Sequence, residues 1–161
     1  MIVEIKQGKV MGTVMKTWKN TDFIGFRGMP YGVAPVNDLR FKDPLKHPGW
    51  TGVFDATTDG PMCPQPRKRP EEIAEDCLRI NVYTHDLNPA ELKPVLVYIH
   101  CGGLYVGSGN SDDFGGPLYM MEHNIVLVTF NYRLGFFGFF NLGTNDYPGN
   151  AGFKDQVLAL K

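Results

Sequence analysis

The residues best suited to chemistry are two adjacent glycines in the middle of the chain. Residues 94–99 begin with proline, are rich in Val, Leu and Ile, and precede a glycine-rich segment. This pattern is typical of a strand buried on both faces of a sheet. His100 and Cys101 come next, followed by Gly102 and Gly103. Because glycine has no Cβ, its backbone N–H can approach a ligand closely, and α/β proteins place ligand sites at this end of a strand.

The glycine loop allows three interpretations. A phosphate-binding loop would carry G-x-G-x-x-G or G-x-x-x-x-G-K-[ST], but the loop glycines fit neither spacing and no lysine follows them. An oxyanion hole needs only a strand and paired glycines, whose backbone N–H groups meet the negative charge of a tetrahedral acyl intermediate. A glycine-rich turn without a ligand is the third interpretation, and the loop by itself leaves it open.

Composition narrows the class of protein. The chain has 161 residues, enough for a single domain, and its 43% hydrophobic and 12% aromatic content argues against disorder. A net charge of −1 gives no electrostatic reason to expect binding to nucleic acid or to an anionic membrane. The one basic run, residues 67–69, lies between two prolines, as expected for a solvated loop.

Targeting signals are absent from the sequence. No apolar segment reaches membrane-spanning length, and the N-terminus lacks the charged and apolar regions of a signal peptide. No Asn-x-Ser/Thr sequon occurs either. These features favour a cytoplasmic location, and secretion stays open if the N-terminus is incomplete.

The elements around the loop predict an α/β fold. Residues 3–5, 10–18 and 23–27 read as an antiparallel meander at a sheet edge. Residues 78–84 alternate in polarity and are expected to pair antiparallel with the 94–99 strand, because the connection is short. Residues 125–130 form a second apolar strand, which a crossover would place parallel to the first in the centre of the sheet.

Other segments are predicted to be loops and helices. Residues 28–60 contain four prolines and no regular periodicity, which predicts a long ordered loop pinned by aromatic side chains. Residues 117–123 are a candidate short helix, and a second helix is expected after Asn150 as its N-cap. The four phenylalanines within residues 136–140 are expected to be core.

Cys63 and Cys77 flank a charged loop. If they are bridged, a loop of this size would stabilise the fold by about 3 kcal/mol through its constraint on the unfolded chain. Two unpaired thiols are the alternative, which a cytosolic location would favour.

A set of motifs in fixed order resembles one protein family. The motifs are LRF at 39–41, W-x-G-V-x-D-A-T at 50–57, G-P-x-C-x-Q at 60–65, E-D-C-L-x-I-N-V-Y at 75–83, H-x-G-G-x from 100, N-Y-R-L-G-x-x-G-F at 131–139 and P-G-N-A-G-x-K-D-Q at 148–156. Together they cover nearly the whole chain. The sequence is similar to the type-B carboxylesterase and cholinesterase family, and to insect α-esterases in particular.

The resemblance implies an α/β-hydrolase fold with an oxyanion hole. Its donors would be the backbone N–H groups of Gly102 and Gly103, with a third from the residue after the nucleophile. The family also implies two structural ion pairs and two family cysteines. These residues are Arg40 with Glu75, Arg133 with Asp155, and the cysteines Cys63 and Cys77.

The nucleophile of the family has no counterpart in these residues. In this fold the catalytic serine sits in a G-x-S-x-G elbow and is followed by Glu or Asp and then His. Ser108 and Ser111 both lack that context. The four histidines come too early in the chain order and are expected to be structural or surface residues: His47, His85, His100 and His123. The sequence is therefore interpreted as the N-terminal portion, residues 1–161, of one carboxylesterase domain.

Two residues of the loop depart from the family pattern. Cys101 stands where the family has glycine, and its side chain is expected beside the oxyanion hole, where it would crowd the substrate, shift the Gly102 donor or bring a thiol near the acyl group. A tolerated small residue is the simpler interpretation. Leu104 replaces an aromatic residue, which would loosen the pocket wall.

The predicted function is that of a serine carboxylesterase acting by acyl transfer on apolar carboxylic esters, without metal or cofactor. The alternative is a non-catalytic relative of the same fold used for adhesion or binding. A G-x-S-x-G motif beyond Lys161 would support the enzyme, and its absence the binding protein. The 161 residues alone are predicted to be inactive.

Overall fold

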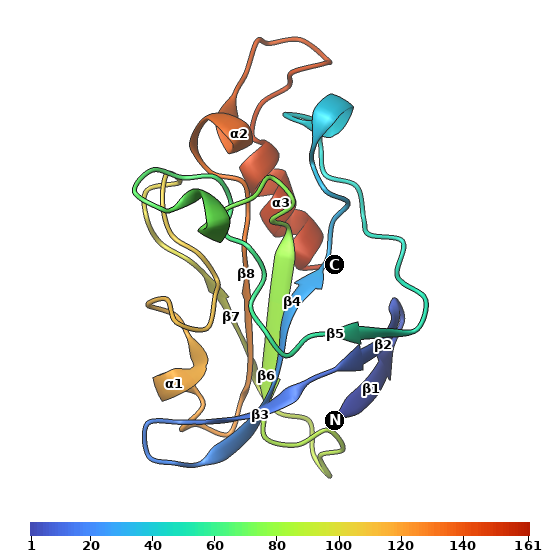
Figure 1. Cartoon of the computed structure of the whole chain (residues 1–161), viewed down its shortest axis with the longest axis vertical. Helices are drawn as coiled ribbons and strands as arrows, with labels where there is room; N and C mark the ends of the chain where they lie inside the picture. Colours follow the sequence, from blue (N-terminus) through green and yellow to red (C-terminus); the bar gives the residue numbers. More distant parts are fainter.

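The computed structural model describes all residues, 1–161, and contains two β-sheets (Figure 1). The smaller sheet has the order β1-β2-β5 and the larger one the order β3-β4-β6-β8-β7. The strands are β1 (Ile2–Ile5), β2 (Gly8–Met11), β3 (Thr13–Lys16), β4 (Asp22–Pro30), β5 (Val53–Asp55), β6 (Arg79–Thr84), β7 (Val95–Ile99) and β8 (Val126–Phe130). The helices are α1 (Pro117–Met120), α2 (Gly135–Phe139) and α3 (Ala151–Ala159), with 3-10 turns at Asn37–Leu39 and Pro70–Glu72.

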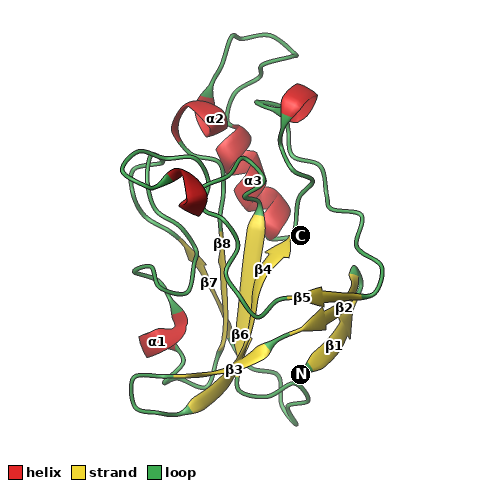
Figure 2. Cartoon of the chain, in the orientation of Figure 1, coloured by secondary structure: helices red, strands yellow, loops and turns green.

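The two apolar strands pair as predicted. β7 and β8 are parallel, in a register that joins Val95 to Val126 and Ile99 to Phe130. β6 does not lie beside β7, so the prediction of that pairing was wrong. It pairs antiparallel with β8, which occupies the position between them, and with β4 on its other side. The chain between β6 and β7 therefore skips one strand position, which β8 later fills (Figure 2).

The segment predicted as one strand over residues 10–18 is two strands in different sheets. The chain turns at Gly12, where an added Cβ would lie 2.7 Å from the Phe26 ring and 2.8 Å from the Gly25 carbonyl oxygen. This close crossing over β4 separates β2, which pairs with β1 and β5, from β3, which pairs with β4. The predicted loop over residues 28–60 likewise contains β5.

The C-terminal helix begins where predicted but without the predicted cap. Asn150 precedes α3 with a φ of 56°, and its side chain makes no capping hydrogen bond. The short helix predicted over 117–123 is a single turn, α1. None of the helices combines the length and the apolar character that a membrane span requires.

The phenylalanine cluster was wrongly predicted to be core. Phe136 is 62% exposed, and its ring packs 4.8 Å from that of Phe140 and 5.2 Å from that of Phe41. The cluster lies on α2 and the segment after it, beyond the end of the large sheet (Figure 1), so it forms a half-buried aromatic surface.

The large sheet is buried unevenly. On β8, Leu127 and Phe130 are fully buried, whereas on β7 the successive residues Val95, Leu96 and Val97 are 61%, 42% and 36% exposed. Consecutive residues of a strand point to opposite faces, so β7 is bare on both. The prediction that it is buried on both faces was wrong because β7 is the edge strand of the sheet.

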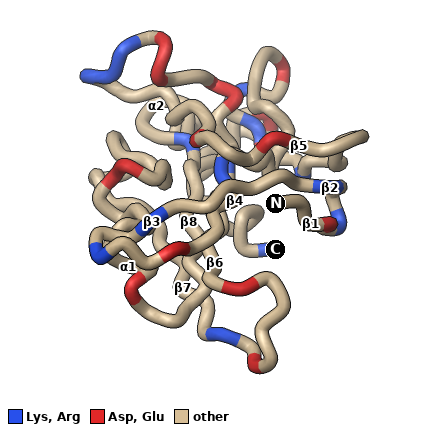
Figure 3. The backbone as a smooth tube through the Cα atoms, turned by 60° about the horizontal axis from the view of Figure 1, so that its bottom comes forward, with Lys and Arg blue, Asp and Glu red and all other residues tan.

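Charged residues are distributed without a dominant sign. Lys and Arg are scattered over the backbone together with Asp and Glu (Figure 3). This distribution agrees with the near-zero net charge of −1 and leaves the glycine loop as the feature to consider for function.

Candidate active site

The glycine loop leaves β7 in a conformation that only glycine suits at its centre. Gly102 has a φ of +122°, and a Cβ there would lie 1.9 Å from the carbonyl oxygen of Val106. The N–H groups of Tyr105 and Val106 both donate to the Gly102 carbonyl oxygen, each at 3.1 Å. Gly103 has a φ of +61°, and a Cβ there would face open space. The loop is thus a tight turn wound around Gly102, with Gly103 at its accessible side.

Adjacent backbone donors of this turn are left without a partner. The N–H groups of Gly102 and Gly103 make no hydrogen bond within the chain. Adjacent unpaired donors at the carboxyl end of a strand are what an oxyanion hole requires, because they are fixed before negative charge develops. The geometry therefore suits the predicted chemistry.

Leu104 anchors the turn to the rest of the protein. Its φ of 62° is unusual for a residue with a side chain, and its carbonyl oxygen accepts a hydrogen bond of 2.8 Å from the N–H of Gly135, at the start of α2. Its side chain packs against the buried cluster that contains Tyr132 and Leu134. Leu104 is therefore partly buried rather than a free part of the loop.

Buried polar side chains hold the far end of the loop at Gly109. The Asn131 Oδ1 atom accepts a hydrogen bond of 2.7 Å from the Gly109 N–H, and the Asn81 Nδ2 group donates to its carbonyl oxygen at 2.7 Å. The Thr129 hydroxyl donates to the same carbonyl oxygen at 2.5 Å. A Cβ on Gly109 would lie 2.6 Å from the Phe130 backbone nitrogen. Both asparagines lie within the quoted family motifs, but no sequence pattern predicted these contacts.

His100 has a structural role in this arrangement. Its ring stacks on that of Tyr132, with centroids 4.3 Å apart, and its Nδ1 lies 3.0 Å from the Cys101 carbonyl oxygen. The Tyr132 hydroxyl donates to the His100 carbonyl oxygen at 3.1 Å. Burial lowers the pKa of His100. Because the Cys101 carbonyl oxygen can only accept, Nδ1 is the donor in this hydrogen bond.

Neither serine is placed as a nucleophile. The Ser108 hydroxyl donates to Asp113 at 2.7 Å, and the Ser111 hydroxyl donates to Asp59 at 2.5 Å. Arg27 donates to both Ser111 and Asp59. Each hydroxyl is therefore engaged with a carboxylate and has no histidine as a hydrogen-bond partner, which a serine nucleophile needs for activation.

Cys101 is the one free cysteine and is exposed. The Tyr98 hydroxyl lies 4.0 Å from its Sγ atom. Its position directly before Gly102 brings a thiol to the same turn as the two free donors.

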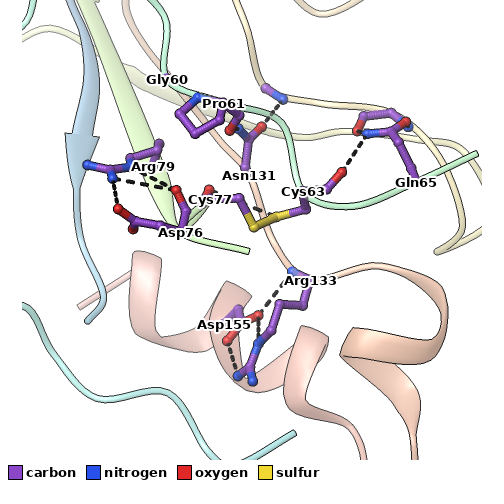
Figure 4. The surroundings of a disulfide bond; sticks show 12 residues. Gly60, Pro61, Cys63, Gln65, Asp76, Cys77, Arg79, Asn131, Arg133 and Asp155 are labelled. Atoms are coloured by element: carbon purple, nitrogen blue, oxygen red, sulfur yellow. Dashed lines mark hydrogen bonds and ion pairs between the residues drawn. A yellow bond between two sulfur atoms is a disulfide. The ribbon is translucent and has the colours of Figure 1, made fainter. Parts of the chain in front are cut away.

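Figure 4 shows the surroundings of the disulfide. Cys63 and Cys77 are bonded, with their Cα atoms 4.9 Å apart, which confirms the bridged alternative. Both residues are buried in the largest core cluster, which also contains Leu78 and Phe130. The bridge therefore joins the segment before the charged loop to the start of β6.

Both expected ion pairs are present in the structure. Arg40 donates to Glu75 through Nε at 2.5 Å and through Nη2 at 2.8 Å. Arg133 donates to Asp155 through Nε at 2.8 Å and through Nη2 at 2.7 Å (Figure 4). The first pair is partly exposed, whereas the second is buried and joins the end of β8 to α3.

Comparison with known proteins gives a consistent result. The family model described as "Carboxylesterase family" matches residues 1–161. Juvenile hormone esterase of Tribolium castaneum is 43% identical over 99% of this chain, which covers 28% of that protein. Esterase FE4 of Myzus persicae is 40% identical over 99% of this chain, which covers 29% of that protein. The chain thus spans less than a third of the length of these relatives.

A solved structure supports the same assignment. The crystal structure of juvenile hormone esterase from Manduca sexta with OTFP covalently attached superposes with a TM-score of 0.91 at 36% identity. The match covers 99% of this chain and 31% of that one. The predicted fold, the N-terminal part of an α/β-hydrolase, is confirmed. Because the family model matches residues 1–161, the chain belongs to the carboxylesterase family.

Proposed function

We propose that this chain forms the oxyanion-hole portion of a serine carboxylesterase that hydrolyses apolar carboxylic esters. The observation that carries the proposal is the pair of unpartnered N–H groups at Gly102 and Gly103, held at the end of a parallel strand. The names of the relatives, which include juvenile hormone esterase and esterase FE4, support an ester as substrate. The covalently attached OTFP in the Manduca sexta enzyme agrees with a covalent intermediate.

The proposed chemistry divides the work between this chain and a nucleophile outside it. A serine hydroxyl adds to the ester carbonyl carbon while a general base takes its proton, which later goes to the leaving alcohol, and the carbonyl oxygen becomes an oxyanion that accepts hydrogen bonds from Gly102 and Gly103. Collapse of the intermediate expels the alcohol and leaves an acyl-enzyme, which water hydrolyses to the carboxylic acid. Loss of one oxyanion donor lowers kcat by about 10²–10³-fold in a hydrolase of this kind.

The proposal is tested first on the 161-residue protein. We expect no hydrolysis of an activated aryl ester above that of a variant lacking both serines, Ser108→Ala with Ser111→Ala, because neither serine lies in a G-x-S-x-G elbow. A fluorophosphonate probe should leave the wild-type protein unlabelled. Stoichiometric labelling of either serine, together with turnover, would contradict this assignment.

The second test concerns the gene. Sequencing the transcript past the codon for Lys161 should reveal a G-x-S-x-G motif followed by Glu or Asp and then His. A longer open reading frame without that motif would favour a non-catalytic binding protein of the same fold.

A further inference from the structure

Gln65 contacts the glycine loop through both ends of its amide. The Gly107 N–H donates to Gln65 Oε1 at 2.8 Å, and Gln65 Nε2 donates to the Gly107 carbonyl oxygen at 2.9 Å. One side chain thus satisfies both backbone groups of one residue, as a neighbouring strand would. No other side chain or backbone group makes a hydrogen bond with Gly107.

Gly107 in turn supports the residues that carry the free donors. Its φ is +110°, and a Cβ there would lie 2.5 Å from the Cys101 carbonyl oxygen and 2.6 Å from the His100 Nδ1 atom. The preceding residue, Val106, donates its N–H to the Gly102 carbonyl oxygen at 3.1 Å, and its own carbonyl oxygen fills the space that a Cβ on Gly102 would need. At such close contact a displacement of residues 106–107 displaces the backbone of residues 100–102, because packed atoms cannot overlap.

Gln65 is itself fixed by the disulfide segment. Its Nε2 group also donates to the Cys63 carbonyl oxygen at 3.2 Å, and Figure 4 shows Gln65 on the same segment as the bridged Cys63. Cys63 is 1% exposed, and the adjacent Met62 pairs with the backbone on the other side of the charged loop. A long polar side chain is therefore held in one position instead of sampling many rotamers.

We propose that Gln65 is a positioning residue of the oxyanion loop, which it holds against the disulfide segment so that the Gly102 and Gly103 N–H groups keep one orientation. Gln65 does not touch the substrate and takes no part in bond making. The role of the two glycines as oxyanion donors rests on the proposed function. The hydrogen bonds of Gln65 are observed in the structure and do not depend on that function.

The experiment uses the 161-residue protein at micromolar concentration and compares Gln65→Leu with Gln65→Glu. Leucine removes both hydrogen bonds to Gly107, whereas glutamate keeps the acceptor for its N–H and loses the donor. Hydrogen exchange read by mass spectrometry reports on residues 105–109. The alkylation rate of Cys101, the exposed free thiol next to Gly102, reports on the turn itself. Gln156→Leu is the matched control, because the side chain of this half-buried glutamine makes no hydrogen bond in the structure.

We expect Gln65→Leu to speed exchange in residues 105–109 about tenfold or more and to change the alkylation rate of Cys101. Gln65→Glu should have a smaller effect on both, and Gln156→Leu none. Exchange in β6 and β8 should stay as in the wild type. If Gln65→Leu loosens residues 105–109 while the Cys101 rate is unchanged, Gln65 does not position the turn and the proposal is wrong.

The readouts distinguish positioning from a general loss of stability, and they can fail independently of the proposed function. If Gln65→Leu loosens the whole chain, Gln65→Glu decides: a local change that includes the Cys101 rate supports positioning, and a global loss of protection contradicts it. These readouts do not involve ester hydrolysis, so they stand even if the longer reading frame lacks a nucleophile. Conversely, a longer protein could be active while its Cys101 alkylation rate is unaffected by substitution of Gln65. That result would support the proposed function and contradict the positioning role of Gln65.

Discussion

The carboxylate of Asp155 accepts three hydrogen bonds from Arg133, two from the guanidinium and one of 3.0 Å from the backbone N–H. Arg133 is 2% exposed and Asp155 is fully buried. The pair joins the segment that leaves β8 to α3, so it sets how the last helix meets the sheet.

Arg133→Met should destabilise the protein by about 3–5 kcal/mol, because the Asp155 carboxylate is left buried without its partner. Urea unfolding followed by circular dichroism measures the change. Lys16→Met, which breaks the exposed pair with Asp22, is the control and should cost less than about 1 kcal/mol. Equal effects of the two substitutions would contradict the importance of the buried pair.

Stability should fall as the pH is lowered below about 6.5, the ordinary pKa of histidine, because of His100. Burial lowers the pKa of His100 in the folded protein, so between that lowered value and about 6.5 the unfolded chain binds more protons than the folded one. The free energy of unfolding therefore rises with pH across this window. His100→Phe keeps a ring to stack on Tyr132 and cannot titrate, so its denaturant midpoint should depend less on pH in this range. His123→Gln, at an exposed position, should keep the wild-type dependence.

Removal of the disulfide should destabilise the fold by about 3 kcal/mol, the loss expected for a loop of this length. The double variant Cys63→Ala with Cys77→Ala tests this without a reductant, and its urea midpoint is compared with that of Cys101→Ala. The latter replaces an exposed thiol and should leave the midpoint nearly unchanged. A double variant as stable as the wild type would show that the bridge contributes nothing to stability.

The open edge at β7 should make the isolated chain prone to association. Val95 and Val97 are 61% and 36% exposed on a strand with one unpaired side, and such edges recruit further strands. Val97→Lys should reduce binding of a hydrophobic dye and the light scattering of concentrated samples. Thr51→Lys, at an exposed loop position, is the control for the added charge. A wild-type protein that is monomeric, binds no dye and melts in one sharp transition would show that the edge is harmless.

The sequence was sufficient for elements whose signal is local. Residues 125–130 are apolar throughout, and such a run is recognisable without knowledge of its neighbours. The order of the strands has no local signal in the sequence. The segment between β6 and β7 is short enough for a hairpin, and nothing in it indicates that β8 will lie between them. The break between β2 and β3 at Gly12 depends on the close approach of Phe26, which is a tertiary contact.

The site divides in the same way. The glycine pair could be predicted because residues without a side chain leave their backbone N–H groups accessible to a ligand. The roles of Gln65 and Asn81 were not predicted. Each hydrogen-bonds to the backbone of a residue distant in sequence, Gln65 to Gly107 and Asn81 to Gly109. Such contacts follow no periodicity, so only the folded structure shows them.

The position of β8 has a consequence for synthesis. Within the large sheet β7 pairs with β8 alone, and Val95 meets Val126. On the ribosome β7 emerges well before its partner, while β4 and β6 can already pair with each other. The apolar β7 segment must therefore wait without a partner until the chain has grown past Phe130. During that interval both edges of β7 are unpaired, next to the glycine turn that follows it.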